Sequence, residues 1–124
     1  MKRFLAVLLA ALPLAAAAQP APAVPPRAQA EIEHLFGYIS ASSCRFERNG
    51  SWHDMAAARQ HVNMKFEYLR DRGEIDSAEA FIDNAASKSS LSGKDYQVQC
   101  GASQAIPSRT WLRDELARFR GHAG

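Results

Sequence analysis

The chain has 124 residues, with 15 lysines and arginines against 13 acidic residues, and 47% of its residues are hydrophobic. Its formal charge of +2 comes entirely from Lys2 and Arg3, so the remainder of the chain is neutral. A neutral chain gives no electrostatic support for binding to nucleic acids or to anionic membranes, and we expect neither partner.

The N-terminus has the pattern of a secretory signal peptide. Two basic residues precede the apolar run "FLAVLLAALPL", and the small residues "AAAAQ" follow with an expected cleavage site near Ala18. The apolar run is shorter than the eighteen or so residues that a membrane-spanning helix needs. The first cysteine, Cys44, is far from the cleavage region, which argues against a lipid anchor. We expect residues 1–18 to be removed, leaving a periplasmic or secreted chain with no membrane span.

A proline-rich segment follows the expected cleavage site. Residues 19–29, "QPAPAVPPRAQ", hold four of the six prolines in the chain, and such a composition favours an extended spacer. We therefore expect one small globular domain over residues 30–120 and a C-terminal tail over residues 121–124. A domain of this size buries only roughly 60–65% of its unfolded surface, so a covalent cross-link would help it fold.

Apolar residues repeat at helical spacing in four parts of the domain. The first predicted helix covers about residues 28–42 and the second about residues 52–72. The third begins at "DSAE", in which Asp76 as N-cap and Glu79 would form a capping box. The fourth covers about residues 110–120.

Two short stretches have strand periodicity instead. In "KDYQVQC" Tyr96, Val98 and Cys100 alternate with glutamines, and Cys44 and Phe46 alternate with polar residues in "CRFE". An antiparallel pairing with Cys44 opposite Cys100 also places Phe46 opposite Val98, so the apolar side chains share one face. The sequence therefore predicts an α+β fold, mainly helical, in which about four helices pack with a short two-stranded antiparallel ribbon.

The two cysteines are predicted to form a disulfide. Two cysteines in an exported chain most often pair, and the Cys44–Cys100 bridge would close a loop of 57 residues counting both ends. Chain entropy gives such a cross-link about 4 kcal/mol of stabilisation. The alternative is a Cys44 nucleophile assisted by His53 or His61, but it leaves Cys100 unexplained and needs a thiolate in an oxidising compartment.

The sequence carries no recognisable catalytic or cofactor signature. It lacks a nucleophile elbow, a complete phosphate-binding loop and an HExxH helix. His53 and His61 are eight positions apart, which is a weak spacing for a metal site without further ligands. We name no catalytic residue, metal ligand or cofactor and expect a protein that is not an enzyme, with a hydrolase of unknown type as an alternative.

Several motifs resemble those of a known family. "CRFERNG", "HVNMK", "AEAFIDNAASKSSLSGKDYQVQC" and "WLRDELARFR" are similar to the small secreted bacterial proteins grouped as domain of unknown function 5329. The resemblance extends from about Glu31 to Arg120. It implies an exported small domain with two cysteines, and it implies no activity.

Polar residues that suit an anion gather in three parts of the sequence. The second predicted helix carries His61 and Lys65 on one flank, and the loop "SKSSLSGKDY" offers hydroxyls, backbone N–H groups beside a glycine, and ammonium groups. The end of the first strand would adjoin this loop in the predicted register. The candidate ligand-binding residues are Arg48, Asn49, His61, Lys65, Ser89, Ser90, Ser92, Gly93 and Lys94.

A structural interpretation of the same residues stays open. Serines and a glycine after a helix can provide a cap and a turn, and Asn49-Gly50 is a common tight-turn pair. On the functional interpretation, we expect a periplasmic binding or interaction module whose partner is an anionic small molecule, a glycan or another periplasmic protein.

The loop also suggests an alternative function. "SGKDY" fits the pattern S-G-x-x-Y, which resembles a loop motif of periplasmic lysozyme inhibitors. An inhibitor of a cell-wall hydrolase is therefore the second hypothesis, although those inhibitors are β-rich and this chain is predicted to be mainly helical.

Overall fold

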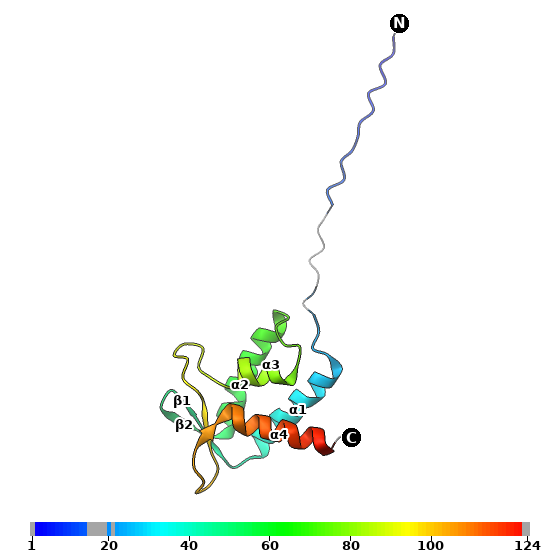
Figure 1. Ribbon diagram of the computed structural model, residues 1–124. Coiled ribbons are helices and arrows are strands. Elements are labelled where there is room, and N and C mark those ends of the chain that lie inside the picture. Colours follow the sequence, from blue (N-terminus) through cyan, green and yellow to red (C-terminus); the bar gives the residue numbers. More distant parts are fainter. Residues whose placement is uncertain (1, 15–19, 21, 123–124) are drawn as a thin grey trace.

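The computed structural model describes residues 2–14, 20 and 22–122. Within these residues four helices and four short strands follow one another, and the small sheet lies at one end of the group of helices (Figure 1). Residues 2–14 form neither helix nor strand and are exposed. The predicted cleavage site near Ala18 lies outside the described residues.

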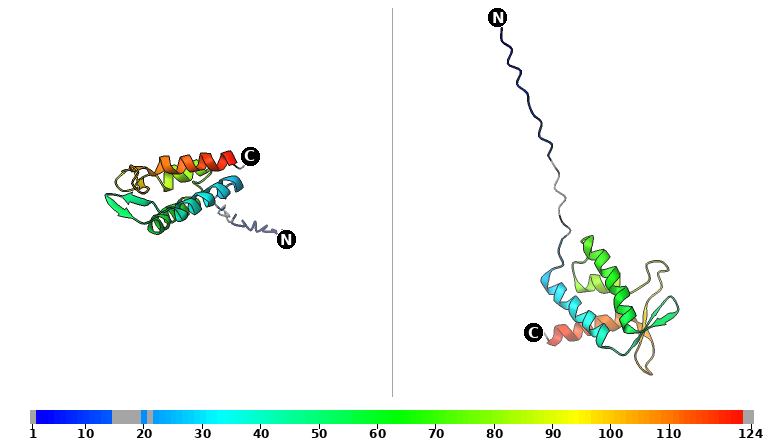
Figure 2. Two further views of the ribbon diagram at one scale, coloured as in Figure 1. Left: turned by 90° about the horizontal axis from the view of Figure 1, so that it is seen from below. Right: turned by 180° about the vertical axis from the view of Figure 1, so that it is seen from behind.

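The four helices pack closely against one another. α1 contacts the other three helices, and α3 also contacts α2 and α4. Figure 2 shows α1 and α4 side by side, with the first hairpin of the sheet projecting beyond one end. Among the described residues, no helix has both the length and the apolar character needed to cross a membrane. The helices are α1 (Pro26–Ala41), α2 (Met55–Asp71), α3 (Ala78–Ala85) and α4 (Ser108–His122).

The first helix begins earlier than predicted. α1 starts at Pro26, so the last four residues of the segment predicted as a spacer are helical. Proline is favourable at the first helical position because its missing N–H would have no partner there anyway. Ala28 is buried against the core, which fixes this first turn.

The second helix begins later than predicted, because the chain first forms a hairpin. Asn49 and Gly50 have positive φ angles of 51° and 83°. These angles suit a two-residue turn of the kind that joins antiparallel strands. Trp52 and His53, predicted to be helical, therefore lie in a strand. α2 starts after Asp54, whose side chain accepts a hydrogen bond from the backbone N–H of Ala57 at 2.8 Å.

The ends of α3 and α4 also differ from the predictions. The N-cap of α3 is Ser77 rather than Asp76, and its hydroxyl accepts a hydrogen bond from the N–H of Ala80 at 3.0 Å. The predicted N-cap is therefore wrong by one residue, since aspartate and serine can both cap a helix and the next residue along the chain takes this role. α4 extends beyond residues 110–120 at both ends and includes residues 121 and 122 of the predicted tail.

The predicted pairing of the two central strands is confirmed. β1 and β3 are antiparallel with Phe46 opposite Val98, as the alternation of apolar residues indicated. Two further short strands add to the outer edges, so the predicted ribbon is the centre of a four-stranded sheet in the order β2-β1-β3-β4. The strands are β1 (Arg45–Arg48), β2 (Ser51–His53), β3 (Gln97–Gln99) and β4 (Ile106–Pro107).

The predicted disulfide is also confirmed. Cys44 and Cys100 form a bridge directly beside the paired ends of β1 and β3. Phe46 and Val98 are 3% and 1% exposed and face the helices. The bridge therefore joins the two strands at the place where they cover the core.

Aromatic rings fill the space between the helices. Phe36 of α1, Phe66 of α2 and Phe81 of α3 lie with their ring centroids 5.1 to 5.7 Å apart. Leu35 and Ile82 beside them are completely buried. Burying one large apolar side chain stabilises the fold by about 1.5–3 kcal/mol. This cluster is therefore the main support of the helical part.

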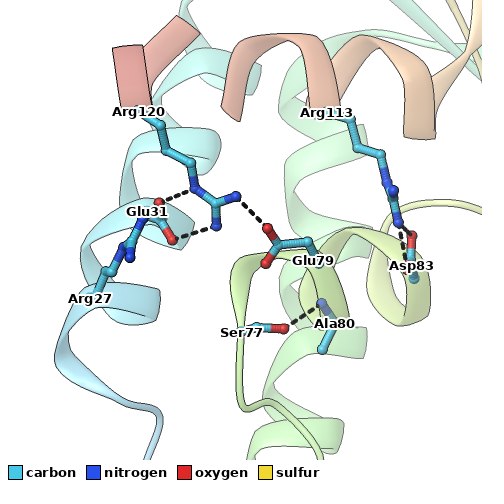
Figure 3. A network of polar contacts seen from close by, with 8 residues as sticks. All are labelled: Arg27, Glu31, Ser77, Glu79, Ala80, Asp83, Arg113 and Arg120. Carbon is cyan, nitrogen blue, oxygen red and sulfur yellow. Dashed lines mark hydrogen bonds and ion pairs between the residues drawn. The ribbon is translucent and has the colours of Figure 1, made fainter. Parts of the chain in front are cut away.

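An ionic cluster joins three helices at the end away from the sheet (Figure 3). Arg120 of α4 donates two hydrogen bonds, of 2.6 and 3.0 Å, to the carboxylate of Glu31 on α1, and a third to Glu79 on α3. These hydrogen bonds lower the pKa of both carboxyl groups. We refer to Arg120, Glu31 and Glu79 as the Arg120 cluster. Nearby, Arg113 pairs with Asp83 at 2.7 Å.

Candidate functional site

A hollow of about 520 Å³ lies between the β1–β2 hairpin, α2 and the loop that precedes β3. Its walls come from three segments that are well separated in the sequence, and they include six of the nine residues predicted to bind a ligand. We call it the hairpin hollow. Its lining residues are Arg48, Asn49, Ser51, His53, His61, Lys65, Ser89, Ser90, Leu91 and Tyr96.

The basic side chains of the hairpin hollow are positioned by regular secondary structure. Arg48 is the last residue of β1, immediately before the tight turn. His61 and Lys65 are four residues apart on α2 and therefore project from the same face of that helix. A strand end and one helix face thus bring these three side chains together.

Hydrogen bonds determine the proton position on His61. The Arg48 guanidinium donates to Nδ1 of His61, and Nε2 of the same ring lies 3.0 Å from the hydroxyl oxygen of Tyr96. A guanidinium can only donate, so Nδ1 must accept and Nε2 must carry the hydrogen. His61 therefore donates to Tyr96, with the tautomer assigned from its partners.

Lys65 completes the environment of the Tyr96 hydroxyl. Its ammonium group donates to that hydroxyl at 3.2 Å and to the backbone carbonyl of Lys88 at 2.8 Å. The Tyr96 oxygen therefore accepts from both Lys65 and His61. Because both bonds use its lone pairs, the hydroxyl hydrogen of Tyr96 is left as a donor for another group.

Burial and neighbouring charges change the pKa values of these groups. Burial, followed by the positive charges of Arg48 and Lys65, lowers the pKa of His61 to about 4. Burial and the charge of Arg48 also lower the pKa of Lys65, whereas burial raises the pKa of Tyr96. At neutral pH His61 is therefore an uncharged imidazole, and Tyr96 keeps its proton.

The charged side chains in the described lining of the hairpin hollow are positive. Its described lining includes Arg48 and Lys65 but no aspartate or glutamate. Positive groups that lack a carboxylate partner attract an anion, and hydrogen bonds between charged groups are about twice as strong as neutral ones. The lining therefore has the chemistry of an anion-binding site.

Asn49 connects the hairpin to the serine-rich loop. Its amide nitrogen donates to the hydroxyl of Ser89 at 3.2 Å, and the hydroxyl of Ser92 donates to its amide oxygen at 2.6 Å. Gly93 has a positive φ of 72°, and its N–H donates to the carbonyl of Ser89, which closes the loop. Asn49, Ser89 and Ser92 thus hold the two walls of the hollow together.

Three of the predicted binding residues lie beside the hairpin hollow rather than in its lining. They are Ser92, Gly93 and Lys94, all exposed on the loop. The structure also adds four lining residues that the sequence interpretation did not include. Ser51 stood just before the predicted second helix and His53 inside it, Tyr96 was counted as core, and Leu91 carried no polar signal.

Tyr96 shows why the sequence interpretation was incomplete. Its side chain is 1% exposed and packs against Phe46, as its place in the strand pattern predicts. Its hydroxyl nevertheless reaches His61 and Lys65 at the floor of the hairpin hollow. The available signal was chemical, because a buried tyrosine hydroxyl usually needs a polar partner.

Metal coordination has no comparable arrangement. In the part of the chain that the structure describes, no group of three or more His, Cys, Asp or Glu side chains lies close enough together to hold a metal ion. The hairpin hollow contributes only His53 and His61 to such a set.

Comparisons with known proteins identify the family. Residues 26–120 match the family of unknown function DUF5329, and the chain belongs to this family. The chain is also similar to "Uncharacterized protein YfeK" of Salmonella typhimurium, with 47% identity over 51 residues. That alignment covers 41% of this chain and 41% of YfeK, so less than half of the relative's length is spanned. No solved structure matches the chain.

Proposed function

We propose that this member of DUF5329 is an exported protein that binds a small anionic ligand in the hairpin hollow without chemically changing it. The carrying observation is the lining itself, which combines Arg48 and Lys65 with the Tyr96 hydroxyl and, among the described residues, includes no carboxylate. The ligand class is a carboxylate, a phosphate or an acidic glycan group.

The donor capacity of the site supports an anion with two or more oxygen atoms. A guanidinium has five N–H donors, and the bond to His61 uses only one nitrogen of Arg48. The remaining donors can form the paired hydrogen bonds that carboxylates and phosphates accept from arginine. Lys65, which donates a hydrogen bond to the Tyr96 hydroxyl, adds a second positive charge to the site.

The state of His61 supports binding rather than catalysis. Both ring nitrogens already have protein partners, and a pKa of about 4 makes the imidazole a weak base at neutral pH. The disulfide removes Cys44 and Cys100 as thiol nucleophiles. The pair of a Cys44 nucleophile and a His61 base, which was the alternative drawn from the sequence, therefore finds no support in these contacts.

Two observations support export to the periplasm or beyond. The apolar run from Phe4 to Leu14 is exposed, with Leu14 at 98%, so it packs against no part of the domain. Disulfides such as Cys44–Cys100 persist in oxidising compartments. We propose that residues 1–18 are a signal peptide cleaved near Ala18, which would remove this apolar run from the mature protein.

The test is a calorimetric titration of the exported, processed protein with acetate, phosphate and a uronic acid. We expect Arg48→Gln and Lys65→Gln each to weaken binding about 10- to 100-fold, because each removes a charge-assisted hydrogen bond. Their melting temperatures should stay close to that of the original protein.

Two matched variants control for general electrostatic attraction. Arg45→Gln removes a positive charge from the other end of β1, and Lys94→Gln removes one from the loop beside the hollow. Both should bind with nearly the original affinity. Absence of binding to all three anions contradicts the proposal, and so does equal weakening in Arg45→Gln and Arg48→Gln.

The exposed loop supports the second candidate function, inhibition of a cell-wall hydrolase. Leu91 is 98% exposed, and residues 90–95 are exposed on a loop that projects beside the hairpin (Figure 1). Tyr96 of the "SGKDY" motif is buried, so only the first four residues of the motif are accessible. If lysozymes of several types stay fully active with micromolar protein, this candidate is wrong.

A further inference from the structure

A second hollow adjoins the first. It has a volume of about 300 Å³ and is lined mainly by the side chains of Met64, Tyr68 and Leu69 on α2, with Asn84 at its edge. Lys65 and Ser90 line both hollows. The cationic site therefore continues directly into an apolar one.

Exposed apolar side chains are concentrated around this pair of hollows. In the described part of the chain beyond residue 22, the large apolar side chains that are exposed are Met64, Tyr68 and Leu91, at 61%, 62% and 98%. Each of them lines one of the two hollows. Single exposed apolar residues need no explanation, but a group of them commonly marks a binding surface.

The spacing along α2 separates the polar and apolar ends of the surface. His61, Lys65 and Leu69 follow at four-residue intervals on one row of the helix. At 1.5 Å per residue, His61 and Leu69 are about 12 Å apart along the helix axis. A ligand that follows this row would have its charged group near His61 and Lys65 and its apolar part near Leu69.

We propose that the ligand is an amphiphilic anion, with its charged group in the hairpin hollow and an alkyl or aromatic group in the second hollow. This inference rests on the proposed function, since it takes the hairpin hollow as the site of the anion. Positive charge in the first hollow selects the anionic end, and the exposed side chains of Met64 and Tyr68 in the second hollow lose contact with water over the apolar end.

The test compares acetate, hexanoate and octanoate by calorimetry on the exported, processed protein. Each added methylene should strengthen binding about two- to fourfold, because it is transferred from water into an apolar site. Octylamine, which is positively charged at neutral pH, should bind much more weakly than octanoate, because Arg48 and Lys65 repel it.

Matched substitutions at one exposed position test the apolar hollow directly. Met64→Gln keeps the length and helix propensity of the side chain but makes it polar, whereas Met64→Leu keeps it apolar. We expect Met64→Gln to weaken octanoate at least threefold and to leave acetate unchanged. Met64→Leu should bind both ligands as the original protein does.

The outcomes separate this inference from the proposed function. If acetate and octanoate bind equally well and both require Arg48, the anion site stands and the amphiphilic ligand is wrong. If none of the carboxylates binds, the amphiphilic ligand is wrong, and the proposed function is wrong as well when phosphate also fails to bind. If octylamine binds as tightly as octanoate, the apolar hollow takes up alkyl chains without recognising an anion, which also overturns the inference.

Discussion

The two ends of the helical group use positive charge in opposite ways. At the end away from the sheet, Arg120 contacts the carboxylates of Glu31 and Glu79, and Glu31 is 5% exposed (Figure 3). At the sheet end, Arg48 and Lys65 line a hollow whose described lining has no carboxylate. Paired charges join helices at one end, whereas at the other end the positive charges line a cavity and form no ion pair within the part of the chain that the structure describes.

The pKa shifts record this difference. Hydrogen bonds from Arg120 lower the pKa of Glu31 and Glu79, which means that the fold stabilises their charged forms. Burial and like charges lower the pKa of His61 and Lys65, which means that the fold disfavours their charged forms. A domain keeps such unfavourable groups mainly where a ligand can compensate for them.

The largest effect should come from the disulfide, which joins the sheet end covalently. Replacing both cysteines, Cys44→Ser with Cys100→Ser, should lower the free energy of unfolding by about 4 kcal/mol, because the unfolded chain regains the freedom of a long loop. Urea denaturation measures this change. The original protein with its disulfide chemically reduced should show the same loss of unfolding free energy. A loss smaller than that of the Arg120 variant below would show that the ionic end contributes more to stability.

The next effect should come from the Arg120 cluster. Arg120→Met leaves the buried carboxylate of Glu31 without its main partner, which should cost about 2–3 kcal/mol in urea denaturation. Arg113→Met is the matched control, because its partner Asp83 is on the surface of the domain, and its loss should be much smaller. Equal losses in the two variants would mean that burial of Glu31 is unimportant.

A smaller effect is expected at Asn49, which connects the hairpin to the loop. Asn49→Ala should cost about 1–2 kcal/mol, because it loses the bonds to Ser89 and Ser92 and places alanine at a positive φ. Asn49→Gly loses the same bonds but tolerates this φ, so it should cost less. Amide hydrogen exchange of the loop should rise in both variants. Unchanged exchange would show that Asn49 does not hold the loop.

An effect that depends on pH is expected from the titration of His61. Its pKa of about 4 lies below the usual 6.5, so the unfolded chain takes up a proton before the folded one. The contribution of His61 to stability is therefore complete above about pH 6.5 and declines as the pH falls toward 4. The lowered pKa values of Glu31 and Glu79 make the contribution of these two groups to stability complete above about pH 4.5. That contribution is lost as the pH falls below this value.

The two ends of the helical group can be distinguished by experiment, because their contributions to stability change in different pH ranges. Between pH 6.5 and 4.5, His61→Gln should show less loss of stability than the original protein, whereas Arg120→Met should follow the original slope. An NMR titration of the ring should give the low pKa directly. A bound anion should raise that pKa, since it offsets the charge of Arg48. A pKa near 6.5 in the unbound protein would contradict the described geometry.

Much of the fold could be predicted because its signals are local. Helical spacing identified the four helices, and the alternation around Phe46 and Val98 gave the register of β1 and β3. β2 was missed because residues 52 and 53 were assigned to the start of the second helix, and β4 has only two residues, too few for a periodic pattern. Asn49-Gly50 was recognised as a turn pair, but the sequence alone did not show that the chain after it returns along β1.

The candidate site was predictable only in part, because its residues have different local roles. His61 and Lys65 could be paired from their spacing on one helix, and the strand register brought Arg48 toward the loop. Tyr96 fits the pattern of a core residue, and its ring is indeed buried. The position of its hydroxyl between His61 and Lys65 depends on how α2 crosses the sheet, which no local pattern records.

By itself the sequence determined the helices, the central strand register and the disulfide, because each follows from periodicity along the chain or from the number of cysteines. Only the tertiary structure decided which charges are neutralised. Arg48 follows a glutamate in the sequence and Arg120 does not, yet Arg48 lines an open hollow and Arg120 contacts two glutamates. Electrostatic energy depends on distance in space, and folding brings Glu31 to Arg120 but no carboxylate into the described lining of the hairpin hollow.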